Sequence, residues 1–123
     1  MQQTQPLDPR EFIRLARELG ARTDEASLRA AVGRAYYGLF LLAREKLGLS
    51  TTSKDVHGEV TMKLRALHGY WKAADHLKIL RQLRNVADYQ PMPDKAKDRD
   101  WVQNWATAER IVTLVLPQMD AIT

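Results

Sequence analysis

The sequence predicts an all-α protein, built as an up-and-down bundle of four main helices and one shorter helix.

 Apolar residues recur three or four positions apart along nearly the whole chain, and residues that start or stop helices flank each such stretch. No stretch alternates apolar and polar residues as a strand does. A chain of 123 residues is long enough for one hydrophobic core and too short for two ordinary domains. We therefore expect a single domain spanning residues 1–123.

The first helix is expected to begin after Asp8, an N-cap residue followed by a proline at the first helical position, and to end at Gly20. Its expected apolar face comprises Phe12, Leu15, Ala16 and Leu19. A longer second helix is expected from residue 23 or 24 to Leu47, where Gly48 ends it. It is apolar over more than half of its circumference, so it needs neighbours on two sides or a contact with another subunit.

A third helix is expected from residue 54 or 55 through Leu67, and His68-Gly69 should end it. The fourth is expected over residues 71–89, because the stop signal Gln90-Pro91 follows. Its expected apolar stripe comprises Ile79, Leu83 and Val86.

Residues 91–99 are charged, contain two prolines and show no periodicity, so they are expected to form a loop. The fifth helix is expected to begin at Asp100, with Gln103 placed to complete a capping box. Pro117 should end or kink this helix.

Several kinds of chemistry are disfavoured by what the chain lacks. It has no cysteine, so disulfides, thiolate metal sites and cysteine nucleophiles are excluded. It has no phosphate-binding glycine loop, and its three histidines lack metal-ligand spacing, so we expect neither a metal nor a cofactor. There is no basic leader and no apolar run long enough to span a membrane, so we expect a cytoplasmic protein.

Positive charge is unevenly distributed along the chain, whose formal net charge is +4. Residues 63–84 hold six basic side chains and a single acidic one, Asp75. The basic residues are Lys63, Arg65, Lys72, Lys78, Arg81 and Arg84. Such a strip is typical of a surface that binds polyanions, and equally of the solvated face of an amphipathic helix.

Two clusters of polar and aromatic residues are candidate sites. Arg84 and Asp88 are four residues apart on the fourth helix, so they share a face, and Tyr89 follows in the last turn. On the second helix Tyr36 and Tyr37 point about 100° apart, so one can lie in the core and the other in a groove.

Both clusters also have a purely structural interpretation. Arg84 and Asp88 can form a surface ion pair worth only a few tenths of a kcal/mol. The two tyrosines can both be packing residues. His57, at the start of the third helix, can approach another site or simply bond to backbone or water.

The two clusters, in this order and separation, resemble motifs of the HEPN superfamily, small all-helical domains widespread in prokaryotes. Residues 34–40, which read RAYYGLF, are similar to the family's Ala-Tyr-Tyr-Ala-x-Phe signature. His57-Gly58 falls in its middle loop region, and residues 84–89 are similar to the Arg-x-x-Ala-Asp-Tyr ending of one uncharacterised subgroup. The resemblance spans residues 24–91.

The resemblance implies a homodimer of helical bundles in which the two Arg-bearing helices meet at a cleft. In well-characterised members that cleft is a metal-independent ribonuclease site, where an Arg contacts the scissile phosphate and a following His transfers a proton. Many members are toxins encoded with an antitoxin, often a small nucleotidyltransferase that can modify a tyrosine near the motif. In this chain no such His follows Arg84, and Tyr89 stands in its place.

Two functional hypotheses follow from the sequence. In the first, the protein is an RNA-related toxin, a metal-independent endoribonuclease in which Arg84 holds phosphate while His57 or Tyr89 transfers protons. In the second, it is a non-catalytic dimer that binds nucleotide or RNA, or that partners a nucleotidyltransferase. The residues expected to line the binding site are Tyr36, Tyr37, Lys78, Arg81 and Asp88.

Overall fold

The computed structural model describes residues 7–49 and 55–122, which form five α-helices and one short 3-10 helix and contain no strand. The elements are α1 (Arg10–Gly20), α2 (Glu25–Leu47), α3 (Val56–Ala66), α4 (Trp71–Tyr89), η1 (Ala96–Arg99) and α5 (Trp101–Asp120). The predicted all-α class is confirmed. Two of the α-helices, α1 and α3, have only 11 residues each, so three helices are long rather than four. No helix in this part of the chain is long and apolar enough to cross a membrane.

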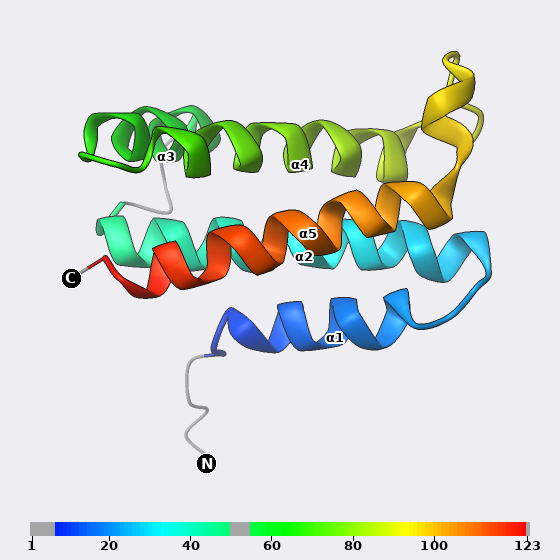
Figure 1. Cartoon of the computed structure of the whole chain (residues 1–123), viewed down its shortest axis with the longest axis horizontal. Helices are drawn as coiled ribbons and strands as arrows, with labels where there is room; N and C mark the ends of the chain where they lie inside the picture. The colour runs from blue at the N-terminus through cyan, green and yellow to red at the C-terminus, as the bar shows by residue number, and fades with distance from the viewer. Residues whose placement is uncertain (1–6, 50–54, 123) are drawn as a thin grey trace, which may run out of the picture.

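The central helix of the bundle is α2. Figure 1 shows α1 along one side of α2 and α4 along the opposite side, with α5 beside α2 and α3 folded back against α4. All four of the other α-helices contact α2. The neighbours that its apolar circumference requires are therefore supplied within the chain.

Side-chain caps set the start of three helices. The carboxylates of Asp24, Asp55 and Asp100 each accept a hydrogen bond from the backbone N–H three residues later, at 3.0, 3.1 and 3.0 Å respectively. Gly48 ends α2 in the left-handed conformation, with a φ of 67°. The predicted ends of α2 and α4 agree with the structure to within two residues. Residue 54, one of the two predicted starts of the third helix, lies outside the described residues.

Two expected apolar stripes are confirmed except at one position each. Leu15 is 40% exposed and Ile79 is 44% exposed, whereas the other expected members are buried or half-buried. Ile13 and Leu80 are buried in the core instead. Successive residues turn by about 100° around a helix, so a stripe shifted by one or two positions faces a different neighbour. The docking of α1 and α4 against α2 selects the stripe that is buried.

Pro117 does not end α5, which continues to Asp120. A proline inside a helix has no N–H to donate to the carbonyl four residues earlier. That carbonyl belongs to Thr113, an exposed residue, so water can replace the missing donor. The segment 91–99, expected to be a loop, contains the short helix η1.

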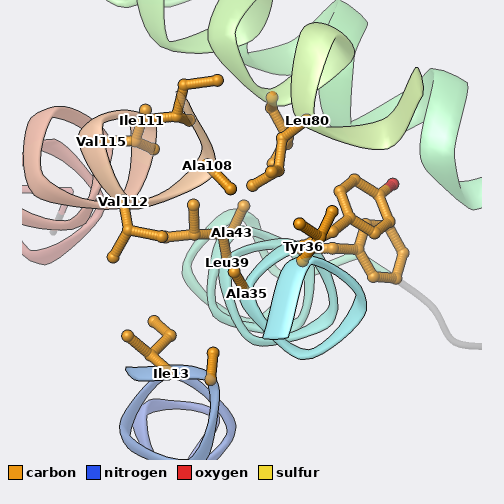
Figure 2. Close-up of a cluster of buried hydrophobic side chains, with 14 of the residues drawn as sticks. Ile13, Ala35, Tyr36, Leu39, Ala43, Leu80, Ala108, Ile111, Val112 and Val115 are labelled. Carbon is orange, nitrogen blue, oxygen red and sulfur yellow. The ribbon is translucent and has the colours of Figure 1, made fainter. Parts of the chain in front are cut away.

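The core lies where α2 meets its neighbours. Figure 2 shows side chains of α2 facing those of α4 and α5 on one side and that of Ile13 in α1 on the other. The other labelled aliphatic residues of this cluster are Ala35, Leu39, Ala43, Leu80, Ala108, Ile111, Val112 and Val115. The ring of Tyr36 lies on the side of α2 away from α5, so its hydroxyl is at the edge of the core.

Gly38 allows α1 to approach α2 closely. A Cβ at this position would lie 2.8 Å from Cγ1 of Ile13 and 3.0 Å from the carbonyl oxygen of Pro9. The backbone nitrogen of Ile13 would be 3.2 Å away. Two of these three atoms are backbone, so a larger residue at position 38 must displace α1 itself.

We predict that Gly38→Val lowers the free energy of unfolding by about 1–3 kcal/mol, because the added atoms overpack a filled contact. Chemical denaturation followed by circular dichroism measures this change. The matched control is Ala26→Val in the exposed first turn of α2, where only helix propensity changes and the cost should stay below about 0.7 kcal/mol. Equal stability of the two variants would contradict the close approach of α1.

Candidate functional site

A pocket of about 360 Å³ opens between α2, the start of α3, and α4. Its lining includes Tyr36 and Tyr37 from α2, His57 from α3, and Arg84 and Asp88 from α4. Five of the eight residues selected from the sequence therefore line one pocket, although they belong to three different helices.

Arg29 fixes the end of α4 against α2. Its Nη1 donates to the carbonyl oxygens of Ala87 and Gln90 at 3.1 and 2.9 Å, and its Nη2 donates to that of Pro91 at 2.9 Å. Its guanidinium also lies over the ring of Trp101, 4.4 Å from the centroid. The last carbonyls of a helix have no partner within it. By bonding to them, Arg29 holds in place the turns of α4 that carry the candidate residues.

The guanidinium of Arg84 lies over the ring of Tyr36, 5.3 Å from its centroid, and the Arg84 side chain is 19% exposed. Its ion pair is with Asp88, at a distance of 3.8 Å that is too long for a hydrogen bond. Asp88 in turn faces Gly33, where a Cβ would lie 3.3 Å from Oδ1. An arginine has five N–H donors, so this loose pair leaves Arg84 able to bind an anion from solvent.

His57 is held at the pocket by a helix cap, a ring stack and a hydrogen bond. It is the second residue of α3, after the N-cap Asp55. Its ring stacks on that of Phe40, with centroids 4.2 Å apart and planes inclined by 20°. Its Nδ1 is hydrogen-bonded to the hydroxyl of Tyr36 at 2.5 Å. These contacts leave Nε2 as the ring nitrogen available to a ligand.

The electrostatic environment keeps both members of this hydrogen bond uncharged near pH 7. Burial raises the pKa of Tyr36 to about 12, and the charges of Arg81 and Arg84 oppose this rise. Burial also lowers the pKa of His57, and the same two arginines lower it further, whereas Asp55 acts in the opposite direction. A neutral imidazole has one nitrogen that can accept a proton, so His57 can serve as a base.

The other two basic residues selected from the sequence lie beside this pocket. Lys78 and Arg81 line a second pocket of about 330 Å³ between α3 and α4, and Tyr36 lines both pockets. The Nε atom of Arg81 is buried and has no hydrogen-bond partner among the described residues. The two pockets are therefore neighbours that share an aromatic wall.

Tyr89 lies apart from the other candidates. It is 70% exposed, lines neither of these two pockets, and has its ring centroid 6.0 Å from Cζ of Arg84. The neighbouring tyrosines of α2 both line the first pocket, Tyr36 as a buried residue and Tyr37 as an exposed one. Tyr37 packs edge-on against Phe12 of α1, with centroids 5.0 Å apart.

Four further lining residues were not selected from the sequence: Ala30, Gly33, Arg34 and Phe40. They lie within two turns of the two tyrosines on α2. Residues three, four and seven positions apart share a helix face, so this spacing could have placed them beside the tyrosines. The aromatic ring of Phe40 matters most, because His57 stacks on it.

Within residues 7–49 and 55–122, no group of three or more His, Cys, Asp or Glu side chains is arranged to hold a metal ion. No protein-family model matches the chain, and neither a curated protein nor a solved structure matches it. The function must therefore be inferred from the pocket and from the motif residues.

We predict that Arg84→Gln raises the pKa of His57, because a nearby positive charge disfavours the protonated imidazole. NMR titration should give a wild-type pKa below the ordinary value of 6.5 and a higher value in the variant. Since the pKa is depressed in the folded state, the stability that His57 contributes is present above pH 6.5 and is lost as the pH falls through the folded-state pKa.

The matched control for this titration is Arg110→Gln. Arg110 is exposed on α5 and lines neither pocket, so the same loss of charge there should leave the pKa of His57 unchanged. An identical titration in wild type and Arg84→Gln would contradict the coupling between the two side chains.

Proposed function

We propose that this chain is a HEPN-like, RNA-related protein of toxin–antitoxin type, and that its first pocket binds the phosphate backbone of single-stranded RNA. One observation carries the proposal: Arg84 and His57, from different helices, line the same open pocket. Phosphodiester chemistry needs a cation for the phosphate and a group that carries a proton. An arginine and a neutral imidazole supply both.

Binding of RNA is supported by the charges and rings around the pocket. Arg84 has only a loose ion pair, and Lys78 and Arg81 add positive charge beside it. Tyr37 is exposed on the pocket wall, so a base can stack on its ring. Phosphate binding to basic side chains weakens as the salt concentration rises. Binding releases counterions from the RNA, and this release is less favourable when the surrounding salt is more concentrated.

Metal-independent cleavage is the activity that the position of His57 favours. In this step Nδ1–H of His57 donates to the hydroxyl oxygen of Tyr36, so that Nε2 is unprotonated. The 2′-hydroxyl gives its proton to Nε2 of His57, and the 2′-oxygen forms a bond to phosphorus. The bond from phosphorus to the 5′-oxygen breaks, and the 5′-oxygen takes up a proton from water. Arg84 stabilises the negative charge that develops on the phosphate oxygens. His57 suits the role of base better than Tyr89, because it lines the pocket and Tyr89 does not.

The toxin–antitoxin part of the proposal is supported by the resemblance of residues 34–40 and 84–89 to HEPN motifs. It includes a nucleotidyltransferase as the partner encoded beside the chain. The non-catalytic alternative keeps the same pocket and the same partner, but the bound RNA or nucleotide is not cleaved.

We predict that expression of the protein in a bacterium arrests growth and that the purified protein cleaves RNA in the presence of EDTA. Arg84→Ala and His57→Gln should each abolish the arrest, because loss of a general base alone reduces the rate about 10²- to 10⁴-fold. Arg110→Ala is the matched control and should remain toxic. Full activity of Arg84→Ala would contradict the proposal, whereas RNA binding by the wild type without cleavage would favour the non-catalytic alternative.

The proposal also includes a homodimer. Its support is the exposed apolar and aromatic surface of α4, where Trp71, Ile79 and Tyr89 are exposed. We predict that sedimentation equilibrium gives a mass of two chains, and that Ile79→Lys shifts it toward one chain, since a buried charge destabilises an interface. Ala106→Lys, which adds the same charge at an exposed position of α5, is the control for charge alone. A single-chain mass for the wild type at high concentration would remove the dimer from the proposal.

A further inference from the structure

We propose that the second pocket, lined by Arg81 and Lys78, is a phosphate subsite next to the first, so that the ligand is an RNA segment with two consecutive phosphates rather than a mononucleotide. This inference rests on the proposed function, because it extends the RNA-binding pocket along α4. It names the class of ligand: an oligonucleotide whose backbone passes both Arg84 and Arg81.

The first observation behind this proposal is that the side chain of Arg81 lacks polar partners among the described residues. Its Nε is buried and has no hydrogen-bond partner, and the side chain forms no ion pair with any described residue. A buried donor that remains unsatisfied is costly in a folded protein. An anion in the second pocket would provide the missing acceptor.

The composition of the second pocket is the next observation. Its lining includes three basic side chains, Arg65, Lys78 and Arg81, and no carboxylate. Arg65 is paired with Asp75, whereas Lys78 is exposed and has no ion pair within the described residues. Two cations without an ion pair in the described part of the chain attract phosphate at one small pocket, because no carboxylate lines that pocket.

The third observation is that the two pockets lie side by side. Tyr36 lines both of them. Arg81 and Arg84 are three residues apart on α4, so they lie on neighbouring parts of one helix face. Both arginines also lower the pKa of His57, which shows that both charges act on the same imidazole. A single strand can therefore reach both guanidinium groups.

The test compares two probes. One is uridine 5′-monophosphate, and the other is a 5′-phosphorylated uridine dinucleotide with 2′-O-methyl riboses, which carries two phosphates and cannot be cleaved through a 2′-hydroxyl. We expect the dinucleotide to bind more tightly to the wild type, and Arg81→Gln to remove that gain while weakening the mononucleotide far less. The slope of log K against log salt for the dinucleotide should become shallower by about 0.7 in Arg81→Gln, the value for one single-strand phosphate.

Three variants complete the design. Arg84→Gln should weaken both probes, because it lies at the first subsite. Lys78→Gln, at an exposed position, should weaken only the dinucleotide, and it keeps the test valid if Arg81→Gln fails to fold. Arg110→Gln removes the same charge away from both pockets and should change neither affinity. Circular dichroism establishes that each variant is folded.

The outcomes separate the two proposals. If Arg84→Gln weakens binding while folded Arg81→Gln and Lys78→Gln bind the dinucleotide as the wild type does, the second subsite is wrong and the proposed function stands. If neither probe binds the wild type, or Arg84→Gln binds both as the wild type does, the proposed function fails. If Arg81→Gln weakens the mononucleotide as much as the dinucleotide, the two pockets hold a single phosphate and the inference is overturned.

Discussion

The burial of α2 among all the other helices is the constraint on which the rest of the structure depends. Small residues along it, including Ala31, Ala35 and Ala43, let its neighbours approach, and Gly38 does the same for α1. One strip of α2, within residues 33–40, lies between the side of α2 that contacts α1 and the side that contacts α4. The candidate site lies on this strip because the packing of apolar side chains stops there.

Local signals in the sequence are sufficient to predict where most of the helices begin and end. A carboxylate at Asp24 or Asp100 and a glycine at position 48 each satisfy backbone groups of the adjacent turn, so their effect does not depend on distant residues. The buried stripes are different. Leu15 and Ile79 are apolar and correctly spaced, but which stripe is buried depends on how a helix docks on α2. That docking is a property of the whole bundle.

The same distinction applies to the candidate site. The i,i+4 spacing of Arg84 and Asp88 predicts a shared face, and the structure places them together on the pocket. The sequence does not reveal that Tyr36 is the buried tyrosine, or that it bonds to His57, because both facts depend on where α3 lies against α2. Nor does it reveal the unsatisfied Nε of Arg81, which depends on which carboxylates come within reach after folding.

The positions of the arginines and the histidine imply a coupling between anion binding and proton affinity. Without a ligand, burial and the charges of Arg81 and Arg84 hold the pKa of His57 below its ordinary value. A phosphate bound to either arginine offsets that positive charge, so it raises the pKa of His57 toward neutrality. By linkage, protonation of His57 must strengthen phosphate binding to the same extent. A general base works best when its pKa is near the ambient pH. On the proposed function, phosphate binding therefore moves the pKa of His57 toward the range in which it can both accept and release a proton.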